Sequence, residues 1–154
     1  MSRRTHRGLW AVGAGLATCL LGGCPTTFQV TFPTALQTTS QDFDLANGKI
    51  RIRVVFNKAV DMSSLDPGNN VILVAETTNN ADITITAGST GADIIITTVD
   101  DASSLLTYDP DGFFSLKLLG SGSNPIKSAD GDVLDGDGDG TAGGDYETGF
   151  VVIG

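Results

Sequence analysis

The alternation of apolar and polar residues between Lys49 and Phe56 limits most strongly how this chain can fold. One face of the segment carries apolar side chains: Ile50, Ile52, Val54 and Phe56. The other face carries basic side chains: Lys49, Arg51 and Arg53. Such alternation predicts a strand with one buried face, which is typical of an antiparallel sheet. We expect the basic residues to form a solvated face or to pair with acids, with a ligand surface as the alternative.

Further short apolar segments follow, separated by Gly, Asn, Asp and Pro. The segments predicted as strands are 71–75, 82–86, 93–99, 105–108, 113–119 and 149–153. One short helical turn is predicted at 63–65. In the turn 109–112 proline presets φ and glycine accepts a positive φ. No sustained helical period follows the first 23 residues, so the sequence predicts an all-β, antiparallel β-sandwich of about seven strands.

The N-terminal segment has the composition of a secretory signal peptide. Arg3, Arg4 and Arg7 precede a run rich in Gly, Ala and Leu that ends at Leu21-Gly22-Gly23-Cys24. A transmembrane anchor is the alternative, but the apolar run is shorter than the roughly 20 residues that a span needs. The ending resembles the lipobox of bacterial lipoproteins, which implies that Cys24 is acylated and becomes the first mature residue.

Cleavage before Cys24 would remove residue types on which much enzyme chemistry depends. His6 is the only histidine, Trp10 the only tryptophan, and Cys19 one of two cysteines. The mature chain would then lack a disulfide, a Ser-His-Asp or Cys-His arrangement, and zinc ligands of the His and Cys type. We expect no enzyme. A glycosidase that uses two carboxylates is the alternative, disfavoured because the aspartates lie in turns.

The charge of the chain argues against several partners. The formal charge of −9 includes three arginines of the N-terminal segment, so the mature chain would carry about −12. Such a field makes nucleic acids and anionic lipid surfaces poor partners. We predict a signal peptide at 1–23, a tether at 24–41 and the sandwich at 42–154. Within the tether, residues 28–32 alternate as an edge strand would.

A second feature is an acidic loop in which six of the sixteen residues from Asp130 to Asp145 are aspartate. The candidate calcium ligands are Asp130, Asp132, Asp135, Asp137, Asp139 and Asp145. The run Asp135–Gly140 matches the D-x-D-x-D-G start of an EF-hand loop, but the twelfth position is Tyr146 and not glutamate. A looser calcium loop is therefore one interpretation, and a solvated, glycine-rich connection without metal is the other.

With these residues in view, the chain resembles the bacterial Ig-like domains of the SbsA or Big-5 type, which are related to S-layer modules. The resemblance covers roughly residues 42–154. The matching segments are 50–56, 57–61, 70–74, 114–118, 126–131, 134–136 and Phe150. It implies an Ig-like β-sandwich and supplies no catalytic residues. Family members usually occur as repeats in long surface proteins, whereas this sequence has one copy.

Together these patterns predict a lipid-anchored, non-enzymatic Ig-like module of the cell envelope. Its expected partners are the membrane, through a lipid on Cys24, and an envelope protein or glycan. The alternative is calcium-dependent binding or adhesion through the acidic loop, with calcium as the only cofactor expected. Because Pro25 and not aspartate follows Cys24, the outer membrane is favoured over the inner membrane.

Overall fold

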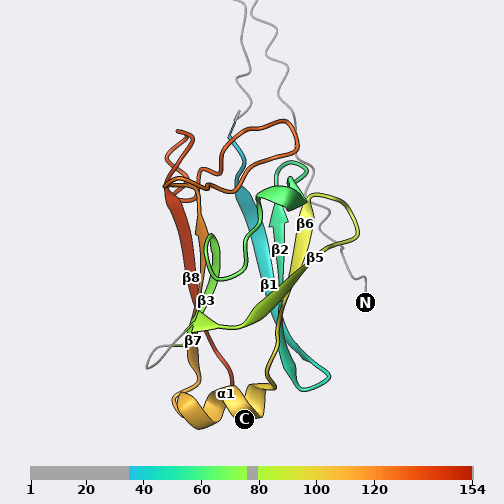
Figure 1. The fold of residues 1–154 in the computed structure, drawn as a ribbon, viewed down its shortest axis with the longest axis vertical. Coiled ribbons are helices and arrows are strands. Elements are labelled where there is room, and N and C mark those ends of the chain that lie inside the picture. Colours follow the sequence, from blue (N-terminus) through green and yellow to red (C-terminus); the bar gives the residue numbers. More distant parts are fainter. Residues whose placement is uncertain (1–34, 76–79, 154) are drawn as a thin grey trace, which may run out of the picture. The chain divides into compact units, whose positions relative to one another are not determined.

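The computed structural model describes residues 35–75 and 80–153 and shows two facing antiparallel sheets (Figure 1). The strands are β1 (Thr38–Ala46), β2 (Lys49–Phe56), β3 (Val71–Ala75), β4 (Asn80–Ala81), β5 (Ile83–Ala87), β6 (Asp93–Thr98), β7 (Phe113–Leu119) and β8 (Asp145–Val151). The helical elements are the 3-10 turn η1 (Met62–Ser64) and the helix α1 (Ala102–Tyr108). The predicted all-β sandwich is confirmed.

The strand order is that of an immunoglobulin-type sandwich. One sheet has the order β1-β2-β6-β5 and the other β4-β3-β7-β8, and every strand pair is antiparallel. The first sheet corresponds to strands A, B, E and D of that fold, and β3, β7 and β8 correspond to C, F and G. Because β4 pairs with β3 and β5 pairs with β6, the chain changes sheets at Asp82. The segment predicted as one strand at 82–86 therefore lies next to a second, two-residue strand.

The core lies between the sheets and follows the alternation of the sequence. On β2 the side chains of Ile52 and Val54 are fully buried, as the pattern predicts. Across the open side of the sandwich, Phe43 of β1 stacks on Phe150 of β8 with ring centroids 4.3 Å apart. Phe150 also stacks on the fully buried Phe114 at 5.7 Å. Three aromatic rings thus join the two edge strands β1 and β8 to the interior.

The segment 105–108, predicted as a strand, belongs instead to the helix α1. Ala102 and Leu105 are buried one helical turn apart and pack into the core at one end of the sandwich. Asp101 ends the preceding segment in an extended conformation, and the N–H of Asp109 closes the helix on the carbonyl of Leu105. Two adjacent leucines were insufficient to distinguish a short helix from a strand, so this prediction was wrong.

The sandwich begins ahead of the boundary expected at Asp42. Ala35 and Leu36 are buried, and β1 starts at Thr38. Leu36 donates its N–H to the carbonyl of Val133 (3.2 Å) and accepts the N–H of Asp135 (2.7 Å). Residues 35–41, which the sequence assigned to the tether, are therefore part of the domain.

The other end of the chain also differs in detail. The last strand, predicted at 149–153, is β8 and begins at Asp145. The predicted signal peptide, Cys24 and the edge strand at 28–32 lie outside the described residues. Among the residues that the structure describes, no helix has the length and apolar character needed to cross a membrane.

Candidate functional site

The acidic loop joins β7 to β8 at the end of the sandwich where residue 35 lies (Figure 1). Its base is fixed by two fully buried side chains, Ile126 and Leu134. The N–H of Leu134 donates to the carbonyl of Ile126 (2.9 Å), and the N–H of Gly136 donates to the carbonyl of Gly143 (3.1 Å). The aspartates therefore project from an anchored base and not from an unsupported connection.

Asp135 is the most buried carboxylate of this loop and is only 2% exposed. Its Oδ2 accepts Gln37 Nε2 (2.7 Å) and the N–H of Gly140 (3.0 Å), while Oδ1 accepts the N–H of Gly138 (2.9 Å). The Gln37 bond is the main cause that holds the pKa of Asp135 below its ordinary value. Asp135 thus folds the loop around itself and ties it to the segment that precedes β1.

Asp137 and Asp139 lie beside Asp135 but are exposed. One carboxylate oxygen from each of the three lies within 4.8 Å of the others. Asp137 accepts the N–H of Asp139 (3.4 Å), and Asp139 accepts the N–H of Thr141 (2.7 Å). The structure therefore brings together the three aspartates of the D-x-D-x-D pattern.

The other three predicted ligands do not belong to this group. Asp132 pairs with Lys58 Nζ at 2.6 Å. Asp145 accepts the N–H groups of Gly120 and Ser121 (both 3.1 Å) and the Ser121 hydroxyl (2.8 Å). Asp130 is exposed in a neighbouring turn. Within the described chain, the group of carboxylates close enough to share one cation contains Asp135, Asp137 and Asp139.

A glycine completes the geometry of this group. Gly144 has a φ of +73°, and a Cβ there would lie 2.6 Å from Cγ of Asp137. A side chain at position 144 would therefore collide with the carboxylate and strain the backbone. The glycine allows the chain to pass close to Asp137 before β8 begins.

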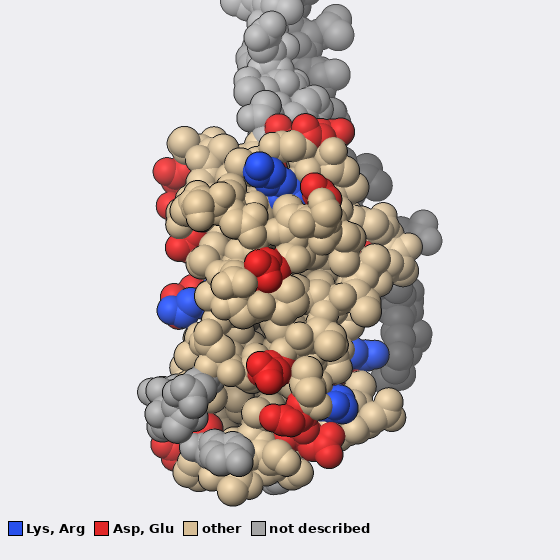
Figure 2. Space-filling model, in the orientation of Figure 1, with Lys and Arg blue, Asp and Glu red and all other residues tan. Residues whose placement is uncertain are grey.

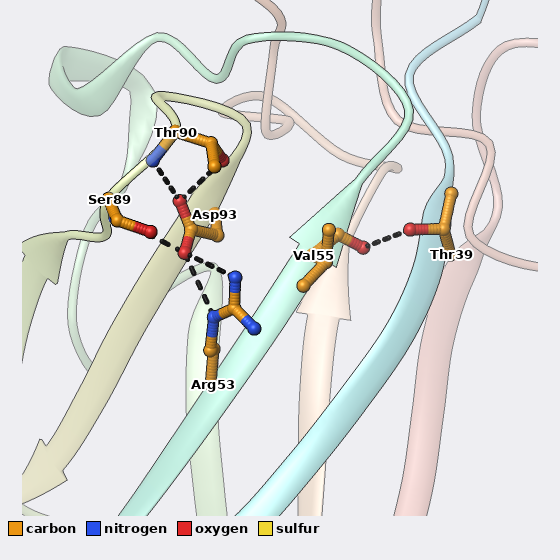
Figure 3. Close-up of polar contacts among 6 residues, drawn as sticks. All are labelled: Thr39, Arg53, Val55, Ser89, Thr90 and Asp93. Carbon is orange, nitrogen blue, oxygen red and sulfur yellow. Dashed lines mark hydrogen bonds and ion pairs between the residues drawn. The ribbon is translucent and has the colours of Figure 1, made fainter.

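The sequence did not identify Asp93 as the partner of Arg53 in a half-buried ion pair on the outer face of the first sheet (Figure 3). Asp93 is 1% exposed and pairs with Arg53 at 2.9 Å. It also accepts the N–H (2.8 Å) and hydroxyl (2.7 Å) of Thr90 and the N–H of Ser89 (3.2 Å). The Thr90 bonds contribute most to holding the pKa of Asp93 far below its ordinary value. The pair ties the β5–β6 turn to β2.

The neighbouring basic residues are also paired. Arg51 forms a bidentate ion pair with Asp44, which stands opposite it in the β1–β2 register. Nε and Nη2 of the guanidinium donate to Oδ1 and Oδ2 of the carboxylate, respectively. On the same pair of strands, the Thr39 hydroxyl donates to the carbonyl of Val55 (3.1 Å; Figure 3). The prediction for Lys49, Arg51 and Arg53 was a solvated face or pairing with acids, and pairing with acids is confirmed for Arg51 and Arg53.

Comparison with known proteins gives matches among solved structures. The sequence matches no protein-family model and no curated protein. Among solved structures, the chain is similar to the N-terminal part of the bacterial S-layer protein SbsC, with 16% sequence identity and a TM-score of 0.48. The match covers 76% of this chain and 24% of that one, so the chain spans about a quarter of its neighbour's length. Membership of the Big-5 type remains a prediction from the sequence.

Proposed function

We propose that this protein is a lipid-anchored, non-enzymatic envelope module whose Ig-like sandwich makes contacts with proteins or glycans. The observation that carries the proposal is the lipobox-like run 21–24 directly ahead of the sandwich. Only residues 25–34 separate Cys24 from Ala35, and ten extended residues span at most about 35 Å. A lipid on Cys24 would therefore hold the domain close to a membrane surface. Pro25 supports the outer membrane as that surface.

The residue inventory supports a binding role over catalysis. After Cys24 the chain contains no histidine and no second cysteine, so a nucleophile paired with an imidazole base is unavailable. The buried carboxylates of Asp93 and Asp135 accept hydrogen bonds that shape turns and loops. Their lowered pKa values suit anionic structural roles and not a general acid.

Lipidation of Cys24 can be tested directly. We expect the full chain, produced in a bacterial host with an alkyne-labelled fatty acid, to carry the label and to fractionate with membranes. The Cys24→Ser variant should lose both properties because it lacks the thiol that is acylated. Cys19→Ser is the matched control and should keep the label. A wild-type chain that carries no label would contradict the proposal. So would a mature N-terminus, identified by mass spectrometry, at a residue other than Cys24.

Calcium-dependent binding through the acidic loop is the second candidate function. The observation that favours it is the convergence of carboxylate oxygens from Asp135, Asp137 and Asp139 within 4.8 Å. Calcium takes six to eight oxygen ligands in flexible geometry, so loop carbonyls and water would complete its coordination. Asp137 and Asp139 are exposed, and their remaining lone pairs can face a cation.

A thermal melt of residues 25–154 tests the calcium candidate, because this span contains every buried core residue that the structure describes. Calcium at a hundredfold excess over its Kd should stabilise the folded state by about 2.7 kcal/mol and raise the Tm relative to EDTA. The Asp137→Asn/Asp139→Asn variant should lose the shift. Asp130→Asn should keep it, because Asp130 lies outside the carboxylate group. Equal melting in calcium and in EDTA would contradict the calcium candidate.

A further inference from the structure

Two adjoining apolar grooves lie at the end of the sandwich that carries α1, opposite the acidic loop (Figure 1). One has a volume of about 160 Å³ and lies between β1 and β8, with Phe43, Ile50 and Phe150 in its lining. The other has a volume of about 280 Å³ and lies between the β1–β2 turn and α1, with Ala102 and Leu106 in its lining. Three residues line both grooves: Leu45, Val152 and Ile153.

Three apolar side chains of this double groove are exposed to solvent. Leu45 is 55% exposed, Val151 59% and Ile153 85%. Each groove is smaller than the roughly 300 Å³ at the lower end of pockets that enclose small molecules. Shallow, adjoining hollows of this size fit successive side chains of a protein segment better than they enclose a compact ligand.

The charged side chains beside the groove include two exposed carboxylates, those of Asp100 and Asp101. Asp101 lines the groove at the start of α1, and its side chain makes no capping hydrogen bond. Asp100 beside it is exposed, and neither carboxylate forms an ion pair within the described residues. The nearby Lys49 donates to the carbonyl of Val99. On the face shown in Figure 2, acidic side chains are spread from end to end of a largely uncharged surface, with a few basic side chains among them.

From this combination we propose that the double groove is the contact surface for a basic amphipathic segment of a protein partner. Apolar side chains of that segment occupy the grooves around Leu45 and Ile153, and its lysine or arginine side chains pair with Asp100 and Asp101. The apolar contact supplies affinity, and the opposite charges select the partner and orient it. The inference rests on the proposed contact function but requires no lipid, so a test in solution separates its failure from that of lipidation.

The test follows backbone amide NMR shifts of residues 25–154 during titration with a synthetic peptide of alternating lysine and leucine. We expect shifts confined to residues 43–50, 99–106 and 150–153. Leu45→Asp should weaken binding at least about tenfold, and so should Ile153→Asp. Both substitutions make the groove more acidic, so an attraction that depended only on charge would become stronger. Asp100→Asn/Asp101→Asn should weaken binding and reduce its dependence on salt.

Two controls make the outcome decisive. Met62→Asp alters a residue that is 38% exposed on η1, outside the groove, and should leave the affinity unchanged. A peptide of alternating lysine and serine should bind at least about tenfold more weakly. Equal affinity for both peptides, shifts outside the groove, or tighter binding by Leu45→Asp would overturn the proposal. Concentration-dependent shifts of the groove residues without peptide would assign the surface to a second copy of this chain and would also overturn it.

Discussion

Replacing Leu36 with alanine is expected to lower the free energy of unfolding by about 2–5 kcal/mol, which is typical for a large-to-small change in a core. Leu36 is fully buried, and its backbone bonds to Val133 and Asp135 in the connection between β7 and β8. The change leaves a cavity that this tied segment cannot close by moving inward. Denaturant unfolding monitored by circular dichroism measures the effect.

Leu45→Ala is the matched control, because it removes the same atoms from a side chain that is 55% exposed near the end of β1. We expect it to change the stability by less than about 0.5–1 kcal/mol. Similar small effects at both positions would mean that residues 35–37 act as a tether and not as part of the core. The comparison therefore measures where the domain begins.

Replacing Phe114 with alanine is expected to cost about 3–5 kcal/mol. Phe114 is fully buried on β7 and stacks on Phe150, which in turn stacks on Phe43 of the other sheet. Its loss removes the innermost ring of the contact between the two edge strands. Calorimetric or denaturant unfolding should show a lower Tm or midpoint, with the β-sheet spectrum retained under native conditions.

The adjacent residue supplies the control for this prediction. Phe113 points to the opposite face of the sheet, is 39% exposed and lies over Gly149. Phe113→Ala should therefore cost far less than Phe114→Ala. If the two variants were equally stable, the inward and outward faces assigned to β7 would be incorrect, because a shift of one residue exchanges them.

The sequence predicted the strands in which apolar and polar side chains alternate. It did not predict elements whose structure depends on pairing with another strand or which are too short to show a period. The boundaries of β2, β3 and β7 agree with the segments expected from their apolar periodicity. β1 was not predicted as a strand because it is a polar edge strand whose partner, β2, fixes its conformation. The helix α1 has seven residues, too few to display a helical period.

The acidic loop shows the same division between local and long-range information. The spacing of Asp135, Asp137 and Asp139 in the sequence predicted that their carboxylates lie close together, and the structure places them in one group. The contact of Asp135 with Gln37, across 98 positions, could not be read from that spacing. Likewise, Lys58 and Ser121 take Asp132 and Asp145 as partners from distant segments.

The direction of β1 has a mechanical consequence. The strand starts at the acidic-loop end and reaches Leu45 in the double groove at the other end. Tension between a lipid at Cys24 and a partner in that groove would pass along β1 through its covalent backbone. It would load the β1–β2 ladder, from Thr38 opposite Phe56 to Ala46 opposite Lys49, in shear. Because many hydrogen bonds then share the force at once, the domain should resist pulling in this direction better than a pull that opens the ladder from one end.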